Sequence, residues 1–197
     1  MKEIKVRLTF TEEVLGTASG DPKIHEEFIA SKAPDAPTMA EEIEALGVDD
    51  VIAKGKTVFP RDKDGDPIIW DYQIKGFFKD ACGVLRKVKG THSSKIKAYK
   101  KEIDGLIFIK ERQIKYVFDG EMGNCQRPLR AQTMQGERVA LANSETVPAG
   151  ATIEFTVICL LDEQVDVVME WLNYGQLRGI GQWRNSSKGR FTCEVIE

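Results

Sequence analysis

The segment G-I-G-Q-W-R-N-S-S-K-G-R-F, from Gly179 to Phe191, decides both the fold and the candidate site. Two glycines flank an apolar residue, a polar and cationic loop follows, and a Gly-Arg-Phe step opens an alternating stretch. Glycine permits tight turns and lets a backbone approach a ligand without a side-chain clash. Exposed backbone amides flanked by cations favour an anion, most often a phosphate. The segment therefore predicts a phosphate-binding loop that leads into the last strand.

Regular apolar patterns lie on both sides of this loop. Helical spacing predicts an amphipathic helix that ends near Gly175 and contains Val165, Val168, Met169 and Leu172. Strict alternation predicts a first strand over residues 4–10, a strand over 153–161 and a last strand from Phe191. A further helix is expected at 77–86, and two short strands at 106–109 and 114–118. Residues 87–102 and 120–136 show neither period and are expected to be loops.

The chain order of these elements is strand, helix, strand, strand, helix, strand once two insertions are set aside. This order predicts an α+β fold of the ferredoxin-like type (βαββαβ, RRM-like). One insertion, residues 11–73, follows the first strand, and the other lies between the first helix and the third strand. With no internal repeat or low-complexity linker, residues 1–197 are expected to form a single domain. One sheet face should be covered by two helices and the other left free for a ligand.

Charge is unevenly distributed along the chain. The net charge of −3 argues against a general polyanion binder. Residues 1–50 carry 5 basic and 12 acidic residues, whereas residues 75–115 carry 12 basic and 4 acidic ones. Such a split predicts a local basic surface, with a solvated Lys-rich face as the alternative.

The cysteines and the apolar runs indicate the cellular compartment in which the protein is expected. The 4 cysteines are scattered and form no C-x-x-C pair, which argues against zinc or disulfides and favours a reducing compartment. No apolar run is long enough to span a membrane, and the first residues already alternate as a strand. We expect a cytoplasmic protein without membrane contact, metal or cofactor.

Three stretches, in this order, resemble motifs of the RAMP superfamily of CRISPR-associated proteins, most closely the backbone subunits of type III effector complexes. Residues 61–86, from R-D-K-D-G-D-P to a helix ending in L-R, resemble the family segment R-D-x-x-G-x-P-x-I-P-G-S-S-L-K-G-x-L-R. Residues 145–155 resemble its P-x-G-x-x-F strand entry, and Gly179 to Phe191 resembles its C-terminal Gly-rich loop. The resemblance implies a RAMP fold, RNA binding and assembly into a homo-oligomer.

The first motif departs from the family pattern at its centre. Lys75 stands in place of proline, Phe77 and Phe78 replace two serines that contact RNA in the family, and Lys79 lies near the family's lysine. The two aromatic rings predict either base stacking or helix packing. Packing is favoured for Phe78, and both roles stay open for Phe77.

Three residues are candidates for catalysis. Asp21 lies in the loop after the first strand, where family members carry an aspartate that cleaves bound RNA; its alternative role is a helix N-cap. His25 lies near the place of the general-base histidine of RAMP endoribonucleases, and His92 is the other histidine of the chain. The ordinary pKa of imidazole suits that task. A surface role is the alternative for each histidine.

We therefore expect a protein that binds RNA or a small (cyclic) oligonucleotide, as a stand-alone, virus-encoded antagonist that sequesters a nucleotide signal or guide RNA. Two alternatives stay open: a metal-independent phosphodiesterase or endoribonuclease, and a non-catalytic assembly scaffold. The residues expected to bind the ligand are Lys75, Gly76, Phe77, Lys79, Arg178, Gly179, Gly181, Gln182, Trp183, Arg184, Asn185, Lys188, Gly189 and Arg190.

Overall fold

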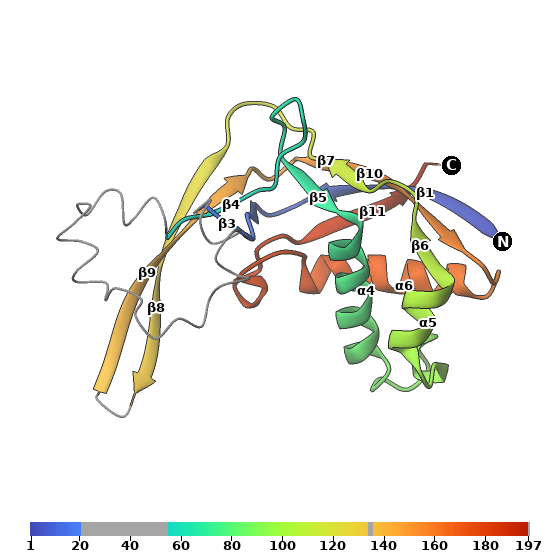
Figure 1. Cartoon of the computed structure of the whole chain (residues 1–197). Helices are drawn as coiled ribbons and strands as arrows, with labels where there is room; N and C mark the ends of the chain where they lie inside the picture. The colour runs from blue at the N-terminus through green and yellow to red at the C-terminus, as the bar shows by residue number, and fades with distance from the viewer. Residues whose placement is uncertain (21–54, 134–135, 197) are drawn as a thin grey trace, which may run out of the picture.

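A four-stranded antiparallel sheet runs through the centre of the molecule (Figure 1). Its strand order is β11 (Phe191–Val195), β1 (Lys2–Phe10), β10 (Thr152–Cys159) and β6 (Ile107–Ile109). The computed structural model describes residues 1–20, 55–133 and 136–196, apart from the side chains at 129–140. The register places Ile4 opposite Val157 and Phe10 opposite Phe191, so the alternating apolar sets share one face. The predicted alternation of the first strand is confirmed.

Helices cover one face of this sheet (Figure 1): α4 (Asp71–Leu85), α5 (Tyr99–Leu106) and α6 (Gln164–Arg178). Phe78 of α4 and Trp171 of α6 are fully buried, and their ring centroids lie 5.4 Å apart. The packing role favoured for Phe78 is confirmed. At Gly175 the helix α6 meets β11 so closely that a Cβ atom would lie 2.1 Å from the Phe191 ring.

The helix α4 begins at Asp71, six residues before the predicted start. The backbone N–H of Trp70 donates to the side-chain Oε1 of Gln73 (2.9 Å), a capping contact that satisfies a free donor at the helix start. Asp71 lies in the first turn, where a negative charge favours the helix dipole. Residues 73–80 therefore belong to the helix, and several of them line a cavity together with residues of the Gly-rich loop.

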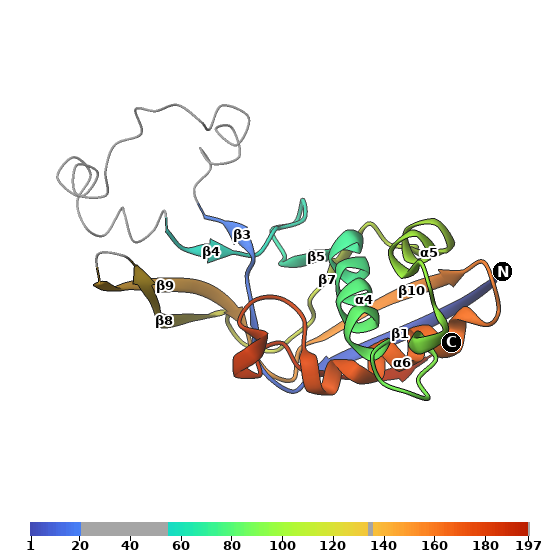
Figure 2. The same ribbon diagram turned by 90° about the horizontal axis from the view of Figure 1, so that it is seen from below.

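Two further sheets, of five and two strands, adjoin the central one. The strands β8 (Gly123–Thr133) and β9 (Gly136–Val147) pair along their whole length, and Figure 2 shows this β8–β9 ribbon extending away from the helices. The base of the ribbon adds β2 (Val14–Leu15), β4 (Thr57–Val58) and β3 (Ala18–Ser19). The third sheet pairs β5 (Ile68–Trp70) with β7 (Gln113–Lys115).

Two expectations about loops were wrong. Residues 120–136 contain β8 rather than an irregular loop. The strand is held by backbone hydrogen bonds to β9, and its polar residues and Pro128 give no strand pattern in the sequence. Residues 87–102 contain the 3₁₀ helix η1 (Ser93–Lys95) and the start of α5. The strand predicted at 106–109 is β6, whereas the strand predicted at 114–118 is shorter and ends at Lys115 as β7; the two pair in different sheets. None of the described helices has the length and apolarity to cross a membrane.

Candidate nucleic-acid interface

The Gly-rich loop (residues 179–190) closes on its own backbone. Gly179, Gly181 and Gly189 have φ values of 71°, 88° and 68°. The N–H of Ile180 donates to the carbonyl of Gly189 (2.9 Å), and a Cβ on Gly189 would lie 1.9 Å from the carbonyl oxygen of Ile180. Gly179 and Gly189 are therefore required by the approach of the loop's two ends, whatever the loop binds.

The middle of the loop leaves backbone donors available. Trp183 has a left-handed φ of 54°, next to a short 3₁₀ turn, η2 (Arg184–Ser186). Within the described residues, the N–H groups of residues 181–184 donate to no protein acceptor. Successive free N–H groups in left-handed turns are typical of anion-binding loops.

Arg127, on β8, is a buried cation beside this loop. Only 5% of it is exposed, and its Nη atoms donate to the Ser144 hydroxyl (3.1 Å) and to Oε1 of Gln182 (2.8 Å). Its Nε has no acceptor, and no carboxylate of the described residues pairs with its charge. Among the described residues, the charge of this buried guanidinium is therefore not compensated, which is an unfavourable arrangement.

Gln182 and Trp183 complete the surroundings of Arg127. The side-chain Nε2 of Gln182 donates to the carbonyl of Gly16 (2.7 Å), which orients its Oε1 toward the arginine. The guanidinium carbon of Arg127 lies 5.2 Å from the Trp183 ring centroid, and Trp183 is 38% exposed. Sequence reasoning found Gln182 and Trp183 but missed Arg127, because it lies in a segment expected to be a loop and belongs to none of the motifs.

The predicted cations of the loop are tied to carboxylates. Arg178 Nε and Arg184 Nη1 both donate to Oδ2 of Asp80, on α4, at 2.9 and 2.7 Å. Burial alone would raise the pKa of Asp80, but the hydrogen bond from Arg178 and the charge of Arg184 outweigh it and lower the pKa. Lys188 pairs with Glu13 (2.6 Å). This side of the loop therefore presents less positive charge than its sequence indicates.

The predicted α4 residues divide between two sides of the helix. Gly76 and Phe77 line a cavity of about 240 Å³, and Gly181 and Arg184 of the loop line the same cavity. Phe77 is only 3% exposed and packs edge-on against Phe191, with ring centroids 5.4 Å apart. The structure thus brings together two motifs that are a hundred residues apart in sequence.

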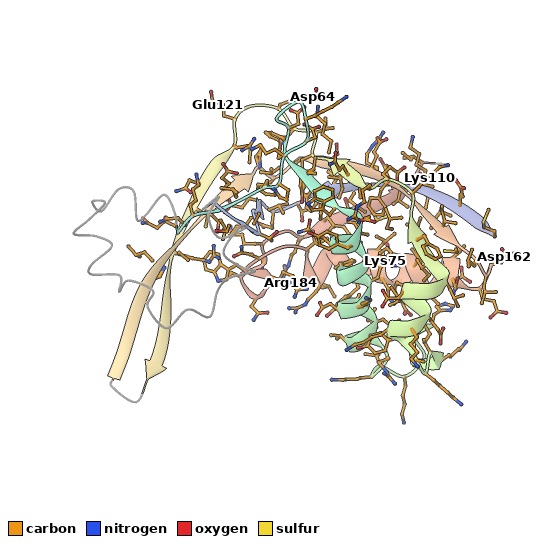
Figure 3. All side chains as sticks on the ribbon, in the orientation of Figure 1. Asp64, Lys75, Lys110, Glu121, Asp162 and Arg184 are labelled. Carbon is orange, nitrogen blue, oxygen red and sulfur yellow. The ribbon has the colours of Figure 1, made fainter. Side chains whose placement is uncertain are left out.

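Lys75 and Lys79 lie on the other side of α4, toward α5. Lys79 pairs with the Asp104 carboxylate (2.6 Å), and Lys75 Nζ donates to the carbonyl of Asp104 (3.1 Å). Burial lowers the pKa of Lys75. Figure 3 shows Lys75 on the side of α4 that faces α5 and Arg184 on the side that faces the β8–β9 ribbon.

The remaining predicted residues are more scattered. Asn185 is exposed and accepts a hydrogen bond from Arg178, and Arg190 has a buried Nε without an acceptor among the described residues. His92 is exposed at the start of η1, past the C-terminal end of α4, and so is not brought to the Gly-rich loop. Asp21 and His25 lie outside the described residues.

The sheet face opposite the helices carries ion pairs. Arg7, on β1, contacts Glu154 on β10 and Glu194 on β11, at 2.7 and 2.9 Å. Lys110 pairs with Glu3 at 2.9 Å. Cross-strand pairs of this kind neutralise the positive charge of the face, so the free face expected to hold a ligand offers few unpaired cations.

Comparison with known proteins bears on the fold. No protein-family model and no curated protein matches the chain. A chain in the cryo-EM structure of the type III-B Cmr-β complex bound to cognate target RNA is similar, with a TM-score of 0.55 and 13% identity. The similarity covers 99% of this chain and 60% of that one, so this chain spans about 60% of its length.

A chain of a type IV-B CRISPR complex also matches, with a TM-score of 0.49, 12% identity and coverage of 99% and 90%. At these identities the likeness concerns the fold. The chain has a mixed helix and sheet fold that is similar to that of a chain in the Cmr-β structure.

Proposed function

We propose that this protein binds RNA at an Arg127 site, formed by Arg127, Gln182, Trp183 and the backbone amides of residues 181–184. The buried guanidinium of Arg127, which has no counter-charge among the described residues, is the observation that carries the proposal. A phosphate bound at the neighbouring backbone amides would bring negative charge to the edge of this guanidinium. Charge-assisted hydrogen bonds of this kind are shorter and stronger than neutral ones.

Trp183 adds a surface for a base in this proposal. One side of its ring lies near Arg127, and the residue keeps 38% of its surface exposed. Stacking of a base on an exposed aromatic ring contributes about 1–3 kcal/mol and tolerates any base. The site is therefore expected to bind the phosphate backbone and the faces of the bases, with little preference for RNA sequence.

The fold supports the same assignment. The similar Cmr-β structure is described as bound to target RNA, and the strand order β11–β1–β10–β6 with two packed helices fits the ferredoxin-like arrangement that we propose for a single domain. Because the similar chains belong to multi-subunit complexes, we also propose assembly with further copies or subunits.

Binding of fluorescent single-stranded RNA, followed by anisotropy, tests the site. Arg127→Met should weaken binding about 10-fold or more, since a charged hydrogen bond contributes about 1.5–3 kcal/mol. The same variant should keep or gain stability against urea, because replacing a buried ion by an apolar residue of similar volume is often neutral or stabilising.

Arg7→Met is the matched control. Arg7 is an ion-paired arginine on the opposite sheet face, so its loss should leave RNA binding unchanged and reduce stability by less than about 1 kcal/mol. A destabilised Arg127→Met protein that still binds RNA normally would show that Arg127 is only structural.

A further inference from the structure

A second positive surface lies at the far end of α4. We define the cationic tip as residues 86–101, R-K-V-K-G-T-H-S-S-K-I-K-A-Y-K-K, which contain 7 Lys or Arg and no Asp or Glu. All of these cations are exposed, and none forms an ion pair with the described residues: Arg86, Lys87, Lys89, Lys95, Lys97, Lys100 and Lys101. Figure 3 shows side chains with nitrogen ends extending outward from this end of the molecule.

The backbone of the cationic tip is held in place. The Thr91 hydroxyl lies within 3.0 Å of the carbonyls of Leu85 and Val88. The Glu170 carboxylate, on α6, accepts the N–H groups of His92 and Ser93 at 2.7 and 3.0 Å. The Glu170 carboxylate is thus engaged by backbone donors and forms no ion pair with the described lysines of the tip.

The cationic tip differs from the Gly-rich loop in this respect. Arg184 and Lys188 of the loop, and Arg178 just before it, all contact carboxylates. At the tip the positive charges repel one another, which a compact fold tolerates only at a cost in stability. A dense polyanion that brings its own negative charges removes that cost.

We propose that the cationic tip is a second contact for nucleic acid, which binds the phosphate backbone of a polymeric RNA without reading its bases. The inference rests on the proposed function and adds that the ligand is a polymer. A small cyclic oligonucleotide has too few phosphates to engage both this surface and the Arg127 site. Asp80, which holds Arg184, precedes Arg86 by six residues, or about 9 Å along a helix, so one strand can reach from the loop to the tip.

The composition of the cationic tip favours RNA over a membrane surface. Membrane-surface segments combine cations with apolar anchors such as Trp, Phe and Leu. The tip contains no Trp, Phe or Leu. Its aromatic residue, Tyr99, is half-buried under Arg86, whose guanidinium lies 5.2 Å from the ring centroid.

The test compares two double variants with equal charge change. Lys89→Gln with Lys97→Gln alters the tip, whereas Lys2→Gln with Lys63→Gln removes two exposed, unpaired lysines elsewhere on the described surface. Binding of a long single-stranded RNA is measured at several salt concentrations. The tip variant should bind about 10-fold more weakly at low salt. The slope of log affinity against log salt should fall by about 1 for each lysine that contacts phosphate.

Two probes and one site variant separate the outcomes. Equal RNA affinity and salt slope for the two double variants overturn the inference, as does tip-dependent binding of phosphatidylserine vesicles without tip-dependent RNA binding. Loss of RNA binding in Arg127→Met but not in the tip variant overturns this inference alone and leaves the Arg127 site standing. The reverse result supports the tip and overturns that site. A cyclic dinucleotide should show no dependence on the tip, and a tip-dependent response to it overturns the polymeric ligand.

Discussion

Asp80 neutralises two arginines at the Gly-rich loop. It binds Arg178 and Arg184 together through one carboxylate oxygen. Asp80→Asn should therefore strengthen RNA binding, because both guanidinium groups keep their charge and lose their counter-ion, whereas Arg184→Gln should weaken it. Anisotropy titrations at one salt concentration measure whether RNA affinity rises in Asp80→Asn and falls in Arg184→Gln. A change in the same direction in both variants would show that Asp80 does not limit the charge available to RNA.

The same carboxylate predicts a pH dependence of stability. Hydrogen bonding to Arg178 and the charge of Arg184 hold the pKa of Asp80 below its ordinary value in spite of burial. The ionised form thus stabilises the folded state above the unfolded pKa of about 3.9, and this stabilisation is lost as the pH falls through the lowered pKa. The difference in unfolding free energy between wild type and Asp80→Asn should be full near neutral pH and shrink in acid. A difference that does not vary with pH would exclude this linkage.

Two glycines with left-handed φ values allow backbone strain to be separated from steric conflict. Gly189→Ala should destabilise the protein by about 3 kcal/mol, because a left-handed φ costs about 1–2 kcal/mol and its Cβ would collide with the Ile180 carbonyl. Gly150→Ala, with a φ of 88° and open space around it, should show the strain alone. Urea unfolding measures both, and equal losses would show that the loop ends can separate freely.

At the scale of elements, Ser93 makes the buried side-chain contacts between the cationic tip and α6. Ser93 is fully buried, donates to Glu170 (2.5 Å) and accepts from Nε1 of Trp171 (2.9 Å). Ser93→Ala should cost about 1–3 kcal/mol, since it leaves a buried indole N–H without a partner. Ser94→Ala, in the exposed neighbour, should cost less than about 0.5 kcal/mol. Similar thermal unfolding of both variants would show that the anchor does not stabilise the fold.

Sequence periodicity predicted some of the strands and helices but not the pairing of β8 with β9. The alternation of β1 and β10 and the presence of a helix at α4 follow from short periods, and the structure has all three, although α4 begins earlier than predicted. The β8–β9 ribbon was missed because its strands carry polar residues such as Gln126 and Asn143, and a two-stranded ladder needs no apolar alternation. Arg127 was missed with it.

At the scale of the whole molecule, charge decides which faces are available to RNA. Lys110 pairs with Glu3 on the sheet edge, whereas Lys89 and Lys97 at the cationic tip have no partner among the described residues. Bound RNA should slow acetylation of Lys89 and Lys97, measured by mass spectrometry, and leave Lys110 unchanged. Protection of Lys110 with exposed tip lysines would place the RNA on the opposite face.

The sequence alone determined the strand periods, the amphipathic helices and the turn of the Gly-rich loop, because each depends on residues a few positions apart. It also located the basic stretch between residues 75 and 115. Only the tertiary structure decided which cations are free. Ion pairs join residues distant in the chain, so Asp80 and Glu13 neutralise the loop's cations. The same long-range pairing of β8 with β9 buries Arg127 at the candidate site, where no carboxylate of the described part of the chain pairs with it.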